Sequence, residues 1–131
     1  MTNDLIYANI SIYSLGEGVK TIEWLGSSKK DLIKFPKIVV QEIGYALYLA
    51  QAGEHYHKTK PFKGSGSGVY EITTEYKKDA YRSIYIVNLA DTVYVIHCFQ
   101  KKSKTGIKTP KENVEVIKKR IKLLKIYLEK R

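Results

Sequence analysis

The chain has 131 residues, of which 44% are hydrophobic and 27% charged, so it is long enough to form one domain with its own core. Its one cysteine, Cys98, excludes an internal disulfide and is typical of a reducing compartment. The sequence shows neither a basic and apolar N-terminal signal nor an apolar run of about 18 residues, so we expect a cytoplasmic protein without a membrane span.

The net charge of +10 is concentrated near the C-terminus. Residues 101–131 carry 12 of the 23 basic side chains and only 3 of the 13 acidic ones. Local positive charge of this kind favours nucleic-acid phosphates or an acidic protein as a partner, although a solvated helix face gives the same pattern.

The first part of the chain predicts two strands and a helical hairpin. Residues 5–13 and 20–25 are rich in β-branched and aromatic side chains, and the turn sequence GEG between them could join them in a hairpin. Residues 28–52 carry apolar side chains at helical spacing, and Pro36 divides them into two helices. Ser28 followed by Asp31 is typical of a capping box at the start of the first helix.

The middle of the chain predicts a loop and then a three-stranded meander. Residues 53–68 contain several glycines and no hydrophobic periodicity, as expected of a loop. Three segments with strand character follow, at 69–76, 80–89 and 92–100. The links between them are too short for a crossover, so the strands are expected to pair antiparallel.

The last segment predicts a long amphipathic helix. Thr109, Pro110 and Glu112 form a capping-box sequence, after which apolar residues at helical spacing make one stripe with lysines on the opposite side. The order of elements predicts a small α+β fold in a single domain, residues 1–131. In this fold an N-terminal helical hairpin and a C-terminal helix pack on a twisted antiparallel sheet.

His97 is the histidine that falls in a predicted strand. Alternation along 92–100 places it on one face with Val93, Val95 and Phe99. A lone histidine on an apolar face is commonly a satisfied core residue. The lysines at the end of the strand would, however, lower the pKa of His97 and suit it to proton transfer near neutral pH.

Arg82 lies in the middle strand of the meander, where a buried charge needs an anionic partner. That partner is either Glu71 or Glu75 of the neighbouring strand, or a phosphate whose oxygens match the planar guanidinium. Lys60 and Lys63 come just before the meander and could project over the same surface.

The sequence contains no motif for a metal site, a covalent hydrolase or a bound cofactor. His55 and His57 have no cysteine or carboxylate at ligand spacing, so a solvated loop explains them better than a metal. The glycines before the meander lack the order of a phosphate-binding loop. Cys98 is expected to face away from His97, which argues against a nucleophilic thiol.

Five segments carry a resemblance to a known family: EWLGSSKKDLIKFP, EIGYALYLAQAG, KPFKGSGSGVYEI, YRSIY and VYVIHCFQKKSKTGIKTP. In this order they resemble the phage-derived HigB-like toxins of the RelE/ParE toxin–antitoxin superfamily. The resemblance covers about residues 20–125 and leaves residues 1–19 as an N-terminal extension. It implies a compact microbial-ribonuclease (RelE-type) fold. It also implies a metal-independent endoribonuclease that cleaves mRNA, commonly on the ribosome, and so inhibits translation and arrests growth. A helix-turn-helix (HigA-like) antitoxin is expected to neutralise this toxin.

The resemblance also implies roles for individual residues. In RNA cleavage of this type the 2′-hydroxyl attacks its own phosphate, while a base removes the proton and cations stabilise the added negative charge. The implied catalytic residues are His97 for proton transfer and Arg82 and Lys63 for charge stabilisation. The residues expected to bind RNA are Lys60, Tyr70, Phe99, Lys101, Lys102 and Lys104.

One position departs from the family pattern. Many members of the superfamily have an arginine soon after the residue that matches Glu71, where this chain has Thr73 and Thr74, so more of the charge stabilisation is left to Arg82. The superfamily also includes ParE-like inhibitors that share the fold without ribonuclease chemistry. A non-catalytic inhibitor of a protein such as gyrase, or a phage-encoded binding module, therefore stays open as an alternative function.

Overall fold

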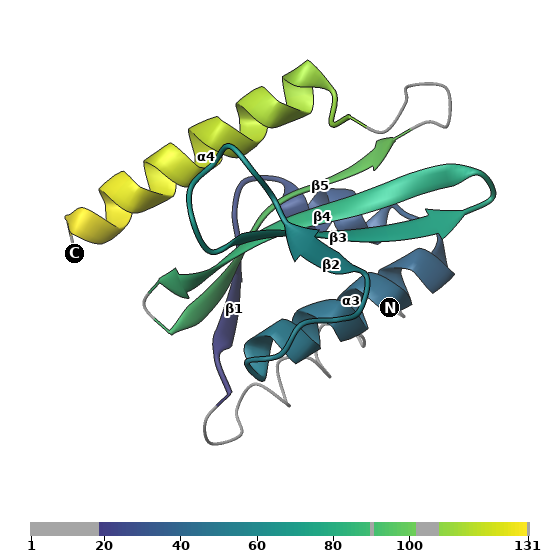
Figure 1. Ribbon diagram of the computed structural model, residues 1–131, viewed down its shortest axis with the longest axis horizontal. Coiled ribbons are helices and arrows are strands. Elements are labelled where there is room, and N and C mark those ends of the chain that lie inside the picture. Colours follow the sequence, from purple (N-terminus) through teal and green to yellow (C-terminus); the bar gives the residue numbers. More distant parts are fainter. Residues whose placement is uncertain (1–18, 90, 102–107, 131) are drawn as a thin grey trace.

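The computed structural model describes residues 19–89, 91–101 and 108–130 (Figure 1). The predicted strand at 5–13, within the expected N-terminal extension, lies outside the described residues. The elements are β1 (Thr21–Trp24), α2 (Ser28–Ile33), α3 (Lys37–Gln51), β2 (Thr59–Pro61), β3 (Val69–Tyr76), β4 (Asp79–Leu89), β5 (Thr92–Lys101) and α4 (Lys111–Glu129).

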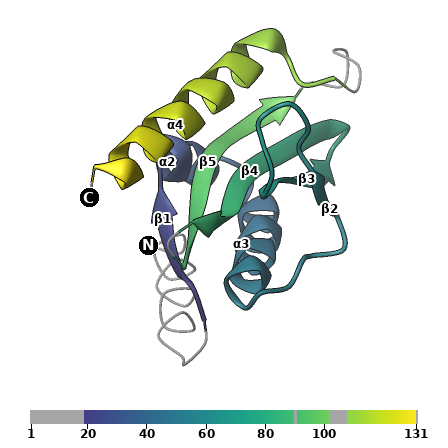
Figure 2. The ribbon, with the colours of Figure 1, turned by 60° about the vertical axis from the view of Figure 1, so that its left-hand side comes forward.

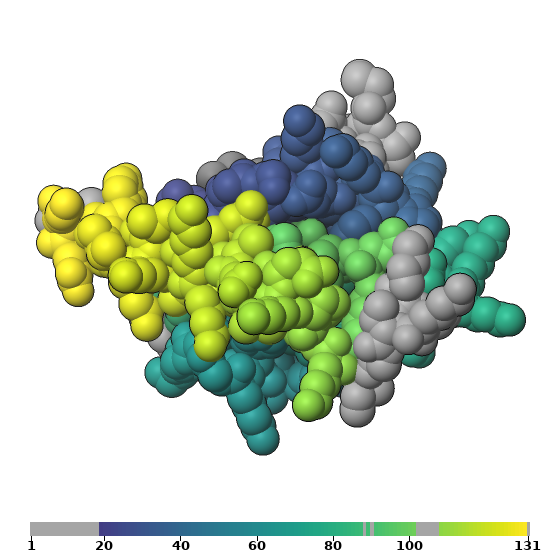
Figure 3. Space-filling view, turned by 90° about the horizontal axis from the view of Figure 1, so that it is seen from above, coloured from purple at the N-terminus to yellow at the C-terminus, as the bar shows by residue number. Residues whose placement is uncertain are grey.

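The sheet lies between two layers of helices (Figure 2). The apolar sides of α2 and α3 cover one face, where the buried core includes Leu32, Ile43, Leu47, Tyr85 and Val95. α4 lies along the other face, where a second core includes Ile84, Ile96, Ile117, Ile121 and Leu124. Figure 3 shows α4 running across that side of the molecule. The predicted α+β class, with a helical hairpin and a C-terminal helix packed on a sheet, is confirmed.

The sheet is mixed rather than purely antiparallel. Its strand order is β1-β5-β4-β3-β2, and the pairs β2–β3, β3–β4 and β4–β5 are antiparallel, as the short links of the meander predict. β1 instead pairs parallel with β5. Two helices and three strands separate β1 from β5 in the chain, so the connection is long enough to return the chain in the same direction.

A short strand interrupts the predicted loop at 53–68. β2 extends the sheet beyond β3, with Lys60 opposite Glu71 and Pro61 opposite Tyr70. Three residues are too few to show the alternation by which a strand is recognised, and proline is tolerated because β2 is an edge strand. This extra strand brings Lys60 into register with the meander.

A β-bulge in β5 changes the direction in which His97 points. Ile84 pairs with His97 but Tyr85 pairs with Val95, so Ile96 is an extra residue in β5. Val93 and Val95 consequently belong to the core under α3, whereas Ile96 and Phe99 belong to the core under α4. The prediction that His97 shares a face with Val93 and Val95 is therefore wrong, because strict alternation assumes a strand without a bulge. His97 and Phe99 do share a face, and their rings stack with centroids 5.2 Å apart.

Neither predicted capping box forms. Ser28 is buried, and its hydroxyl donates a hydrogen bond to the carbonyl oxygen of Val95 at 3.2 Å. The preceding serine, Ser27, is the N-cap of α2 and donates to the Asp31 carboxylate at 2.7 Å. At α4 the N-cap is Pro110, and no side chain caps the helix. In both helices the start is one residue from the predicted one, because tertiary contacts fix the boundary.

Gly26, in the turn between β1 and α2, makes room for a side chain of α4. Its φ of +52° is unfavourable for other residues, and a Cβ at this position would lie 2.8 Å from Cζ of Arg120. Arg120 is held in place by hydrogen bonds to the carbonyl oxygen of Ile96 and to Ser27, so it does not move aside freely.

We expect Gly26→Ala to lower the free energy of unfolding by about 2–3 kcal/mol, from backbone strain and from displacement of Arg120. Gly53→Ala is the matched control, because Gly53 has a φ of +83° but no atom within 4 Å of its added Cβ. Strain alone predicts a loss of about 1 kcal/mol for the control. Urea denaturation of both variants measures the difference, and equal losses would show that the contact with Arg120 is unimportant.

Candidate anion-binding site

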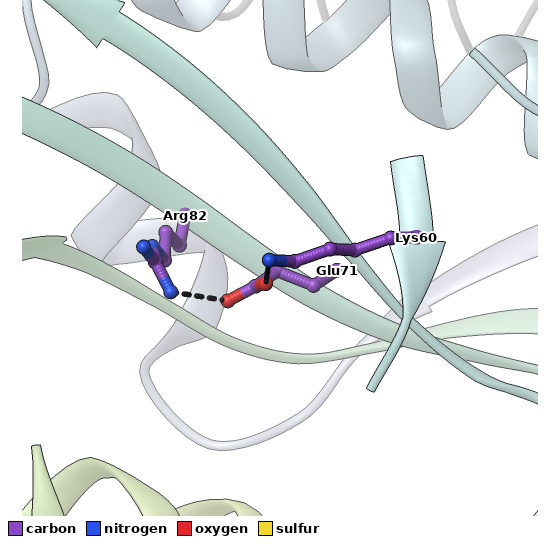
Figure 4. Close-up of polar contacts among 3 residues, drawn as sticks. All are labelled: Lys60, Glu71 and Arg82. Carbon is purple, nitrogen blue, oxygen red and sulfur yellow. Dashed lines mark hydrogen bonds and ion pairs between the residues drawn. The ribbon is translucent and has the colours of Figure 1, made fainter. Parts of the chain in front are cut away.

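Three charged side chains from neighbouring strands meet on the face of the sheet that α4 covers (Figure 4). Arg82 of β4 donates from Nη1 to Oε2 of Glu71 on β3 at 2.9 Å. Lys60 of β2 approaches Oε1 of the same carboxylate, with its Nζ at 3.7 Å. Both oxygens of Glu71 are thus occupied by cations.

The burial of these groups differs sharply. Glu71 and Arg82 are 2% and 7% exposed, whereas the side chain of Lys60 is mostly exposed. The prediction that Arg82 pairs with a carboxylate of the adjacent strand is confirmed for Glu71. An ion pair with a carboxylate and a contact with a phosphate are compatible in principle, because a guanidinium has five N–H donors.

Lys101, at the end of β5, adds a third basic side chain. It pairs with Ala80 and so lies diagonally across from Arg82 on the same face. Lys101 is 3% exposed, and its Nζ has no hydrogen-bond partner among the described residues. Burial and the nearby charge of Arg82 lower the pKa of Lys101, against a smaller opposing effect of Glu71. We name Lys60, Glu71, Arg82 and Lys101 the Arg82 cluster.

An open groove of about 500 Å³ runs beside the Arg82 cluster. Its lining residues are His57, Lys58, Thr59, Lys60, Thr73, Glu75 and Arg82. Thr73 pairs directly with Arg82 in the sheet, so the position where related sequences are expected to have an arginine opens onto this groove. With four basic side chains and one carboxylate in its wall, the groove suits an anionic ligand. We call it the cationic groove.

His97 belongs to a separate polar cluster between β5 and α4. Its Nε2 donates to Oδ1 of Asn113 at 2.7 Å, and its Nδ1 lies 3.3 Å from Nη1 of Arg120. Since an amide oxygen only accepts and a guanidinium only donates, these contacts fit a neutral ring protonated at Nε2. Burial lowers the pKa of His97, a bond to Asn113 opposes this, and the charge of Arg120 adds to the lowering.

His97 and Lys101 lie on opposite sides of Phe99, the strand partner of Arg82, so each is diagonal to Arg82 on the same face. Lys101 follows His97 by four residues on β5, which corresponds to about 13 Å between their Cα atoms. The expectation that the strand exit lies within a few ångströms of His97 is therefore wrong. With both ring nitrogens engaged, His97 has the contacts of a satisfied core residue.

The two predicted stacking residues lie on opposite faces of the sheet. Tyr70 packs on the face of α3, against the rings of His55 at 4.4 Å and Tyr85 at 5.7 Å. Phe99 pairs with Arg82 on the face of α4, but it is only 7% exposed. The structure thus brings Phe99, and not Tyr70, to the Arg82 cluster.

The remaining predicted lysines do not join this cluster. Lys63 is exposed in the loop after β2 and is not among the residues that line the cationic groove. Lys102 and Lys104 lie outside the described residues. Of the predicted site residues, the structure therefore groups Lys60, Arg82, Lys101 and Phe99.

Sequence reasoning missed Asn113 and Arg120, although a signal for them exists. The two positions are seven residues apart, so they fall on one face of α4 together with the buried Ile117. A polar residue that recurs on the apolar side of a helix indicates a buried hydrogen-bond partner. His57 and Lys58 lie in the turn before β2 and were missed because the pairing of β2 with β3, which brings this turn to the groove, was not predicted.

The thiol and the histidines offer no further chemistry. Cys98 is buried on the face of α3 and donates to Ser83 at 3.4 Å, and burial raises its pKa to about 12, so the thiol is unreactive. Among the residues that the structure describes, no three His, Cys, Asp or Glu side chains come together as a metal site. In the described ranges, no helix has the length and apolar character needed to cross a bilayer.

The fold and the site together define a small α+β protein with a cationic groove on a five-stranded sheet. The chain belongs to the family described as phage derived protein Gp49-like (DUF891), whose model matches residues 30–122. Among solved structures, it is similar to the toxin–antitoxin complex RelBE2 from Mycobacterium tuberculosis, with 17% identity and a TM-score of 0.44. That similarity covers 63% of this chain and 99% of the other. No curated protein matches this chain significantly.

Proposed function

We propose that this protein is the toxin of a type II toxin–antitoxin system and a metal-independent endoribonuclease that cleaves mRNA, acting on the ribosome. The observation that carries the proposal is the Arg82 cluster, in which the cations Arg82 and Lys60 and the basic side chain of Lys101 surround one carboxylate beside the cationic groove. The surplus of positive charge has no carboxylate of its own within the cluster. A phosphodiester supplies the missing negative charge. The resemblance to HigB-like toxins supports the same reaction.

We propose a separate task for each member of the cluster. Arg82 is buried and paired with Glu71, so it is suited to stabilise the additional charge that the phosphate acquires when the 2′-hydroxyl attacks. Lys60 is exposed at the edge strand and is suited to bind the RNA backbone on arrival. His97 acts as a positioning residue, because its ring stacks on Phe99, the strand partner of Arg82.

The proposed partners follow from the same assignment. The substrate is single-stranded mRNA, and a helix-turn-helix (HigA-like) antitoxin neutralises the toxin. The exposed lysines of α4, Lys118, Lys122 and Lys125, would attract the RNA of the ribosome through their long-range field.

A second function is favoured by one feature of α4. An apolar groove of about 490 Å³ lies between this helix and the turn after β1, and Leu123 and Tyr127 in its wall are more than half exposed. Such a surface suits a protein partner. The alternative is therefore a non-catalytic inhibitor that binds a protein such as gyrase.

Expression in a bacterial host with mapping of transcript ends distinguishes the two functions. We expect growth arrest together with new mRNA ends that carry 2′,3′-cyclic phosphates, and the purified protein should form the same ends with ribosomes. Lys60→Gln should weaken cleavage about tenfold, since one phosphate contact is lost. Lys63→Gln, three residues away but outside the cationic groove, is the matched control. Growth arrest with intact transcripts would refute the ribonuclease and favour the inhibitor.

A further inference from the structure

Lys101 is a buried lysine whose Nζ has no hydrogen-bond partner in the part of the chain that the structure describes. Lysine is almost never fully buried unless its charge is paired, yet Lys101 is 3% exposed and no described residue accepts a hydrogen bond from its Nζ. Burying an ammonium group in this way is unfavourable, whereas a neutral amine is tolerated much better. The position therefore makes the side chain give up its proton more readily than an exposed lysine does.

The neighbouring charges act in the same direction. Arg82 on β4 and Lys60 on β2 both disfavour a further positive charge, and the one buried carboxylate of the cluster, Glu71, already holds these two cations. Asp79, at the start of β4, accepts a hydrogen bond from Gln100 at 2.8 Å. Glu75 on β3 is exposed at the groove and pairs with Ala80, so a whole strand lies between it and Lys101. None of these carboxylates is placed to neutralise Lys101.

His97 does not supply the proton acceptor that the proposed reaction needs. Its Nε2 donates to Asn113, and its Nδ1 faces the guanidinium of Arg120. Lys101, like His97, lies diagonally across from Arg82, the group suited to hold the reacting phosphate, but its Nζ has no hydrogen-bond partner among the described residues.

We infer that Lys101 is the general base of the reaction, an assignment that rests on the proposed function. Its neutral Nζ takes the proton of the 2′-hydroxyl, and the 2′-oxygen forms a bond to the adjacent phosphorus. The bond from phosphorus to the 5′-oxygen breaks, and that oxygen takes a proton from water while Lys101 returns its proton to solvent. The products are a 2′,3′-cyclic phosphate and a 5′-hydroxyl, with no net gain or loss of protons.

Lys101→Arg separates the charge of this residue from its proton transfer, because arginine keeps the positive charge and does not deprotonate. In single-turnover cleavage at saturating RNA, we expect the rate constant of the wild-type protein to rise with pH until the pH exceeds the lowered pKa of Lys101. Lys101→Arg should bind RNA within about twofold of wild type, cleave about 10²–10⁴-fold more slowly and lose that pH limb. Lys37→Arg, the same exchange at an exposed lysine of α3 on the other side of the sheet, should retain the rate and its dependence on pH.

Two further measurements address the side chain directly. Small primary amines should restore cleavage to Lys101→Ala, with a rate that depends on the pKa of the amine, whereas a purely structural role predicts no rescue. Lys101→Met should raise the urea midpoint of unfolding, because a thioether in this buried position needs no partner. This stability measurement requires no RNA.

The outcomes distinguish the inference from the function on which it rests. If wild type cleaves no RNA, the proposed function fails. If wild type cleaves and Lys101→Arg cleaves equally fast with the same pH profile, only the assignment of Lys101 is overturned. A lower urea midpoint for Lys101→Met would overturn it as well, since the lysine would then be paired and charged in the folded protein.

Discussion

Arg82→Ala is expected to abolish RNA cleavage and to lower the free energy of unfolding by about 3–5 kcal/mol. Without the guanidinium, the carboxylate of Glu71 stays buried with only Lys60, 3.7 Å away and largely in solvent, as its partner. A loss of activity in this variant alone would therefore be ambiguous, because part of the protein would be unfolded. Urea denaturation measures the loss of stability. A cleavage assay with ribosomes and a defined mRNA measures the loss of activity.

A double variant separates the two effects of Arg82. Replacing both members of a buried ion pair with apolar residues of similar size is often neutral or stabilising. We expect Arg82→Met combined with Glu71→Leu to recover most of the stability and to remain inactive. Lys58→Ala is the control, since Lys58 lines the same groove but forms an exposed ion pair with Glu42, which contributes at most about 1 kcal/mol. A stable double variant that still cleaves RNA would exclude Arg82 from catalysis.

The helices and the meander could be predicted from the sequence because each leaves a local signal. Helical spacing marked α3 and α4, and the two short links between 69 and 100 forced antiparallel pairing. The predicted partner of Arg82 followed from the same register, since Glu71 is on the adjacent strand of a hairpin. These features depend on residues that are close in the sequence.

The parts that were missed depend on residues that are distant in the sequence. The parallel pairing of β1 joins Thr21 to Thr92, and no local pattern specifies it. The bulge at Ile96 is held by Arg120 of α4, which donates to the Ile96 carbonyl oxygen at 2.9 Å. A bulge reverses the face on which every later residue of the strand lies. Because the bulge was not predicted, His97 was assigned to the wrong face of the sheet.

Arg120→Ala is expected to lower the free energy of unfolding by about 2–4 kcal/mol, the largest effect for any residue of α4 outside the apolar core. The half-buried guanidinium joins three parts of the fold, through the carbonyl oxygen of Ile96, the hydroxyl of Ser27 and the ring of His97. Its removal leaves a buried carbonyl oxygen unpaired at the bulge. Lys119→Ala, at the neighbouring exposed position of the helix, should change stability by no more than about 0.5 kcal/mol.

The same variant should change the titration of His97. Since the charge of Arg120 helps to lower the pKa of His97, its removal should raise that pKa, although burial keeps it below the usual value. A histidine whose pKa is lowered by folding contributes stability above its unfolded pKa of about 6.5, and this contribution is lost as the pH falls toward the folded pKa. The loss of stability as the pH falls should therefore be smaller in Arg120→Ala than in wild type. NMR titration of the His97 ring and urea midpoints between pH 5 and pH 8 measure both effects, and an unchanged pKa would show that Arg120 does not act on the ring.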